Sequence, residues 1–320
     1  MSESESFQRS DLGAKSPWPH RLAILTAGAT FLLILAGGLV TNTGAGLAVP
    51  DWPTTFGYNM FLYPWSKMVG GIFFEHSHRL IGSVVGLLTL ALALVLWAVE
   101  PRRWLRWLGC LALGGVIIQG VLGGLRVVLL QESLAIVHGA LAQAFFGLMA
   151  SVALFTSREW NEVPAPLRGE GTGRLFRLSA FTTGVIYLQL VVGALLTHVG
   201  ARLDAHLALA GLIAILVPRL GTRIFARHAD QPRLVRPAVV LCGLLVLQVL
   251  LGLGSYVHRF TSVELPVVST LGLALPVTHR LVGGLLLATS LVLALRVHRL
   301  RGASKAVARH GELPGRRVPA

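Results

Sequence analysis

The feature that most constrains this chain is a series of eight apolar segments, most of them long enough to cross a lipid bilayer. They cover roughly residues 22–40, 77–98, 104–125, 134–155, 178–197, 205–221, 237–256 and 279–298. A helix needs about 20 apolar residues to span the hydrocarbon core, and in lipid it satisfies all of its own backbone hydrogen bonds. The sequence therefore predicts an all-α integral membrane protein with eight transmembrane helices.

The composition agrees with this prediction and excludes other classes of protein. Of the 320 residues, 54% are hydrophobic and only 13% are charged, whereas a soluble domain has about 25% charged residues. The two cysteines, Cys110 and Cys242, both lie inside apolar segments. A scaffold held together by disulfide bonds is therefore excluded.

The net charge of +14 is distributed unevenly along the chain. Eight spans place both ends of the chain on one side of the membrane, and all but six of the 28 basic residues then lie on that side. The six exceptions are Lys67, Arg79, Arg126, Arg202, Arg259 and Arg280. Such a bias predicts that both termini are cytoplasmic. It also predicts contact with anionic membrane lipid and argues against binding to nucleic acid.

A polar linker rich in Pro and Gly, residues 157–177, divides the chain into two halves of four helices. The predicted organisation is an N-terminal tail (1–21), a first half (22–156), the linker, a second half (178–298) and a basic C-terminal tail (299–320). No connection is long enough to form a soluble domain.

A short motif recurs in both halves. A glutamine precedes a glycine by four residues in three segments, at Gln119 and Gly123, Gln189 and Gly193, and Gln248 and Gly252. Small residues at such positions let membrane helices approach closely. We interpret the repeat as the trace of two pseudo-symmetric four-helix bundles; the alternative is chance recurrence in apolar sequence of low complexity.

Four histidines occupy equivalent places near the outer ends of the even-numbered segments. They are His78, His138, His206 and His279. A polar ring inside a membrane is expensive and indicates function, although a single one could make an interhelical hydrogen bond. Two facing imidazoles in a four-helix bundle can be the axial ligands of a haem iron. The repeat favours pairing His78 with His138 and His206 with His279, which predicts two haem sites.

Charged residues accompany the histidines of the two halves unequally. Glu75 lies three residues before His78, and nothing equivalent precedes His279. A carboxylate beside one iron could move protons, or it could simply pair with Arg79. Arg79 and Arg280 directly follow their histidines and could extend to the membrane interface or bind haem propionates.

These segments resemble the haem A synthase family over about residues 20–300. The resemblance is carried by GGLVTNTGAGLAVPDWPTTFG and FFEHSHRLIG near the start, and by the later segments VHGALAQAFF, LDAHLALA and THRLVGG. The combination of the loop and the Glu-x-x-His-Arg motif is specific, whereas each isolated histidine motif is weak. Many family members carry a cysteine pair in the first outer loop, but residues 41–74 here contain no cysteine.

The resemblance implies an oxidoreductase of the bacterial inner membrane that converts the C8 methyl of haem O to the formyl group of haem A, for cytochrome oxidase assembly. It implies that His78 and His138 hold the substrate haem, with Glu75 beside its reacting edge. It further implies that His206 and His279 hold a haem b. Expected partners are haem O, haem A, a haem O synthase, an electron donor (ferredoxin or quinol) and a second copy of the chain.

Two other functions use the same histidines. A di-haem cytochrome b would pass electrons from quinol and leave its haems unmodified. A haem carrier or assembly factor would need both histidine pairs but not Glu75.

Overall fold

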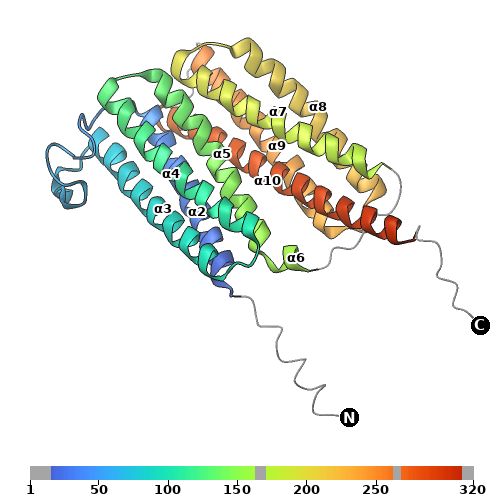
Figure 1. The fold of residues 1–320 in the computed structure, drawn as a ribbon. Coiled ribbons are helices and arrows are strands. Elements are labelled where there is room, and N and C mark those ends of the chain that lie inside the picture. The colour runs from blue at the N-terminus through green and yellow to red at the C-terminus, as the bar shows by residue number, and fades with distance from the viewer. Residues whose placement is uncertain (1–15, 163–170, 262–267, 312–320) are drawn as a thin grey trace, which may run out of the picture.

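The computed structural model describes residues 16–162, 171–261 and 268–311, and within these ranges the protein is built from helices (Figure 1). The long helices are α2 (Trp18–Asn42), α3 (Gly71–Val99), α4 (Arg103–Leu129), α5 (Glu132–Thr156), α7 (Thr172–Val199), α8 (Leu203–Arg227), α9 (Pro232–Phe260) and α10 (Val268–Gly311). Short elements are η1 (Met60–Leu62), η2 (Trp65–Lys67) and α6 (Arg158–Asn161). Eight helices are long and apolar enough to cross a membrane, which confirms the predicted all-α membrane architecture.

All eight long helices extend beyond the predicted apolar segments, and three of the extensions change how the chain is read. Helix α3 begins at Gly71 rather than near residue 77, so it already includes Glu75. Helix α8 continues to Arg227 because arginines at a membrane surface can extend their charged heads into water without ending the helix. Helix α10 begins at Val268 and contains Pro276, a residue that membrane helices tolerate.

Each half of the protein forms a closed ring of four helices. In the first half, α2 contacts α3 and α5, and α4 contacts the same two helices. In the second half, α7 contacts α8 and α10, and α9 contacts the same two. Between the halves, α5 packs against α7 and α10, and α10 packs against α2. This equivalence of contacts is consistent with two pseudo-symmetric four-helix bundles.

Each ring has its own buried apolar core, and a third small core joins them. The joining cluster contains Ile34, Phe146 and Ala288, from α2, α5 and α10. On the outside, large apolar side chains are exposed: Leu87 is 66% exposed, Ile215 65% and Val246 62%. Because such a surface is unfavourable in water, it is the face that lipid covers.

The two ends of the bundle differ. The segment between α2 and α3 extends from one end, whereas α6 lies at the other end, near the start of α2 and the last turns of α10 (Figure 1). At the α6 end the linker is joined to the second half by ion pairs from Glu159 to Arg296 (2.7 Å) and from Glu162 to Arg233 (2.5 Å). Most of the predicted N-terminal tail, part of the linker and the end of the C-terminal tail lie outside the described residues.

Candidate functional site

The first ring brings His78 and His138 together at its centre. His78 lies on α3 and His138 on α5, two helices at opposite corners of the ring. The centroids of the two imidazole rings are 6.4 Å apart, and the ring planes meet at 65°. Both side chains are half-buried. The pairing that the sequence repeat favours is thus the one the fold produces.

The second ring repeats this arrangement with His206 on α8 and His279 on α10. Their ring centroids are 6.3 Å apart, and the planes meet at 56°. Two imidazoles that coordinate one metal ion from opposite sides, through bonds of about 2.0 Å, have ring centres about 6 Å apart. Each pair therefore has the spacing required of two axial ligands.

Each of the four histidines packs against a glycine of the preceding long helix. A Cβ at Gly37 would lie 3.1 Å from His78 Nε2, at Gly123 3.4 Å from His138 Cε1, at Gly193 3.3 Å from His206 Cε1, and at Gly252 2.9 Å from His279 Cε1. A methyl group would press on the ring at Gly252, Gly37 and Gly193, whereas at Gly123 it would reach only van der Waals contact.

The imidazoles also have the chemistry of metal ligands. The Nδ1 atoms of His138, His206 and His279 are buried and have no hydrogen-bond partner, an expensive arrangement unless another acceptor or a metal satisfies them. In the part of the chain that the structure describes, no three His, Cys, Asp or Glu side chains come together as a metal site. A zinc site built from protein ligands is thus absent from these ranges. A haem, whose porphyrin supplies four nitrogens, fits a site that offers only two imidazoles.

Glu75 and Arg79 form a buried ion pair directly beside the first histidine. Arg79 Nη2 lies 2.9 Å from Glu75 Oε1, and the two side chains are 9% and 6% exposed. The second carboxylate oxygen, Oε2, accepts a hydrogen bond from the Val49 N–H at 2.9 Å. The ion pair that the sequence left open as an alternative is therefore present, and the carboxylate is held in a fixed position one helical turn from His78.

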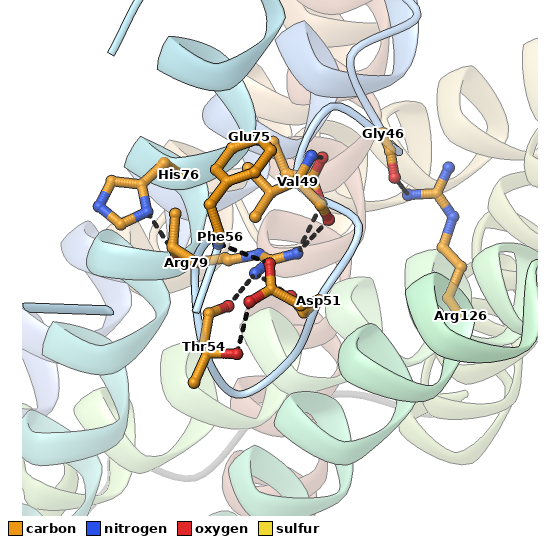
Figure 2. Close-up of polar contacts among 10 residues, drawn as sticks. Gly46, Val49, Asp51, Thr54, Phe56, Glu75, His76, Arg79 and Arg126 are labelled. Atoms are coloured by element: carbon orange, nitrogen blue, oxygen red, sulfur yellow. Dashed lines mark hydrogen bonds and ion pairs between the residues drawn. The ribbon is translucent and has the colours of Figure 1, made fainter. Parts of the chain in front are cut away.

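Arg79 also organises the segment between α2 and α3, which we call the outer loop (residues 43–70). Figure 2 shows the guanidinium group enclosed by this loop. Nη1 donates to the carbonyl oxygens of Asp51 (2.7 Å) and Thr54 (3.1 Å), and Nη2 donates to Val49 O (2.9 Å) as well as to Glu75. All four N–H groups of the two Nη atoms are thus used within the protein, so Arg79 is the anchor of the outer loop.

The tip of the outer loop is held by Asp51. Its carboxylate accepts hydrogen bonds from the Phe56 N–H (2.7 Å), the Gly57 N–H (2.9 Å) and the Thr54 hydroxyl (2.5 Å). Partial burial by itself raises the pKa of Asp51, but these hydrogen bonds outweigh it and bring the pKa below its ordinary value of 3.8. The stabilisation is therefore fully present above that value and is lost as the pH falls through the lowered pKa.

The outer loop rests on the first ring. The indole of Trp52 packs where a Cβ at Gly124 would lie, and Arg126 donates a hydrogen bond to the Gly46 carbonyl at 3.2 Å (Figure 2). Gly124 is next to Gly123, which faces His138. The loop therefore covers the α4 side of the first histidine pair.

Sequence reasoning missed the roles of some neighbouring residues. His76 is 1% exposed, and its Nδ1 lies 3.2 Å from the Thr55 hydroxyl, so it supports the outer loop rather than a metal. Arg280 lies half-buried on α10, next to His279. The sequence identifies Gln189 and Gln248 only as members of a repeat, whereas in the structure their amides contact His206 and His279. Their fixed spacing from Gly193 and Gly252 was the signal that could have shown this.

The chain is similar to known proteins over more than half of its length. The model of the COX15-CtaA family, described as a cytochrome oxidase assembly protein, matches residues 20–207, which include three of the four histidines. The "Heme A synthase" of Exiguobacterium sibiricum is 34% identical over 193 residues, 57% of this chain and 61% of that protein. Those of Shouchella clausii (28% over 189 residues, 57% and 60%) and Cereibacter sphaeroides (28% over 249 residues, 61% and 62%) are also similar. The chain spans about three fifths of the length of these relatives, and it belongs to the COX15-CtaA family of cytochrome oxidase assembly proteins.

Proposed function

We propose that this protein is a haem A synthase, which oxidises the C8 methyl group of haem O to a formyl group for cytochrome oxidase. The observation that carries the proposal is the presence of two imidazole pairs with nearly equal spacing, 6.4 and 6.3 Å, the first of which has a buried carboxylate, Glu75, one helical turn from His78. The family and the "Heme A synthase" relatives support the same activity.

The two pairs have different roles in this proposal. His78 and His138 bind the substrate haem in the first ring, below the outer loop. His206 and His279 hold a haem b, which supplies one-electron transfer when bound. Arg280, next to His279, is placed to bind a propionate of that haem. Arg79 is not assigned a propionate, because the outer loop already uses its N–H groups.

Two successive hydroxylations of the methyl group give a geminal diol, which loses water to form the aldehyde. With dioxygen as the oxidant, each hydroxylation inserts one oxygen atom into a C–H bond and reduces the other to water, which takes two electrons from the donor and two protons. A carboxylate fixed near the substrate can deliver or accept a proton. Glu75 is such a group, since its Oε1 is held by Arg79 and its Oε2 by the Val49 N–H. The outer loop and the apolar ring exclude water from the reacting edge.

We also propose an orientation in the membrane. The α6 end of the bundle faces the cytoplasm of a bacterial inner membrane, because most basic residues lie toward that end. The outer loop then lies on the opposite side. Haem O synthase and an electron donor, ferredoxin or quinol, are the partners that this activity requires.

The test of this function is pigment analysis after synthesis of the full chain in a host that also makes haem O. Reversed-phase chromatography with mass detection should find haem A or its hydroxylated precursor with the wild-type chain. Glu75→Gln keeps the size and planar shape of the side chain and one of its two hydrogen-bond acceptors, so it should bind haem O but yield little or no aldehyde. If the wild-type chain yields only haem b and unmodified haem O, the cytochrome or carrier function replaces the synthase.

The glycines opposite the histidines allow a second prediction. Gly252→Ala should lower haem retention at the second pair, because its methyl group would lie 2.9 Å from His279 Cε1. Gly243→Ala, on the same helix but with nothing within 4 Å, is the matched control and should bind haem normally. Haem content per polypeptide is measured after purification. Equal haem content in the two variants would contradict the assignment of the second pair as a haem site.

A further inference from the structure

The glutamines of the repeated Gln-x-x-x-Gly motif contact the imidazoles of the second ring. Gln189 Nε2 on α7 lies 3.3 Å from His206 Nε2, and Gln248 Nε2 on α9 lies 3.2 Å from His279 Nε2. Each histidine of the second pair therefore has one ring nitrogen held by an amide. The other ring nitrogen, Nδ1, is buried without a hydrogen-bond partner in both residues.

The first ring lacks this contact at both of its histidines. Gln119 occupies the equivalent position on α4, but its Nε2 donates to the backbone carbonyl of His138 at 3.1 Å. On α2, the residue four positions before Gly37 is Leu33, which offers no hydrogen bond. The two imidazole pairs thus have the same spacing but different surroundings.

An amide beside a metal-bound imidazole affects both the orientation of the ring and its electron donation to the metal. A neutral imidazole that binds a metal through one nitrogen carries a proton on the other, and an acceptor for this N–H fixes the ring orientation and increases electron donation to the metal. The Oε1 atoms of Gln189 and Gln248 are buried and have no partner. A half-turn of either amide places Oε1 where Nε2 lies, so that Oε1 accepts the imidazole proton.

We propose that Gln189 and Gln248 are positioning residues that make the second pair a permanent haem site, whereas the first pair, without such amides, is the exchangeable one. This rests on the proposed function, in which the first pair must bind a substrate and release a product. A ligand pair with fixed rings retains its haem, and a pair without this support can release it.

The experiment measures the midpoint potential and haem content of the purified full chain. Gln248→Leu and Gln189→Leu should each raise the potential of the second haem, because weaker donation from the imidazole disfavours the ferric state. A tenfold change in the preference for ferric over ferrous haem corresponds to about 59 mV. A merely structural role would lower haem content or stability without moving the potential of the haem that remains.

Gln143→Leu is the matched control. Gln143 is also buried (5% exposed) with an unpartnered Oε1, but it faces Gly284 of α10 rather than a site histidine. It should leave both potentials unchanged. Suppose that the wild-type chain holds two bis-histidine haems but that Gln248→Leu and Gln189→Leu, like Gln143→Leu, leave both midpoint potentials unchanged. This inference then fails and the proposed function stands. If the wild-type chain holds no such haem, both fail.

The reverse substitution tests the first pair. Leu33→Gln introduces an amide at the equivalent place beside His78, so the first pair should release its haem more slowly to apomyoglobin, by roughly tenfold if the amide acts as outer-shell partners do. Leu33→Met is the control, because it adds no hydrogen-bonding amide. Equal release rates for these two variants would contradict the proposal.

Discussion

Replacing either His206 or His279 with alanine should remove most of the haem that the protein retains on purification. Each ring lies opposite its partner at a centroid distance of 6.3 Å, and loss of one ligand leaves the iron with a single protein bond. We expect a loss greater than the roughly 10- to 100-fold that removal of an outer-shell partner costs in metal affinity. Haem per polypeptide, from the pyridine haemochrome spectrum, is the measurement.

The same substitutions in the first ring should give a different result. His78→Ala and His138→Ala should abolish formation of haem A but leave the haem of the second pair in place. His20→Ala serves as the control, because His20 lies in the first turn of α2, at the α6 end of the bundle and away from the histidine pairs. Its imidazole forms a hydrogen bond with the carbonyl oxygen of Ala153 on α5. Loss of the retained haem only from the His78 and His138 variants would reverse the roles that we assign to the two halves.

Arg79→Leu, on α3, should destabilise the outer loop more than any single substitution within the loop. Glu75 is 4% exposed, so the substitution leaves a buried carboxylate without its cation, which typically costs about 3–5 kcal/mol. The carbonyl groups of Val49, Asp51 and Thr54 lose their donor as well. We expect a lower free energy of unfolding in detergent and rapid proteolysis within residues 43–70.

Two further variants separate the ion pair from a general effect on the loop. Lys67→Ala removes a cation of the same loop whose contact, to the Tyr58 hydroxyl at 3.1 Å, is exposed, so it should have little effect. The double variant Arg79→Leu with Glu75→Leu should be less destabilised than Arg79→Leu alone, because it removes the buried charge as well. If the destabilisation of the double variant equalled the sum of the destabilisations of the two single variants, the buried-pair explanation would be contradicted.

The helices were predictable because lipid imposes both their length and their polarity. The ends of the helices were less predictable, because an apolar segment identified by hydropathy ends near charged residues or proline. Arg223 hid the last turn of α8, and Pro276 suggested a later start for α10 than Val268. The backbone continues through these residues because arginine side chains reach the membrane surface and neighbouring helices tolerate the proline.

At the site, the sequence predicted which histidines meet but not what surrounds them. Equivalent positions in a repeat are enough to place His78 opposite His138 and His206 opposite His279. The use of Arg79 by the backbone of the outer loop depends on the path of an irregular segment. Hydrophobic periodicity does not determine that path. The roles of the four histidines as iron ligands and of Glu75 in catalysis stay predictions.

One histidine of each pair lies on a helix at the boundary between the halves. His138 is on α5 and His279 is on α10, and these two helices pack against each other. A shift of either helix that accompanies ligand binding is therefore shared by both sites. Suppose that a haem bound in the second ring changes the affinity of the first ring for its substrate by some factor. Thermodynamic linkage then requires that substrate bound in the first ring changes the affinity of the second ring for its haem by the same factor. In the proposed function, haem affinity at one ring is therefore to be measured at a fixed occupancy of the other.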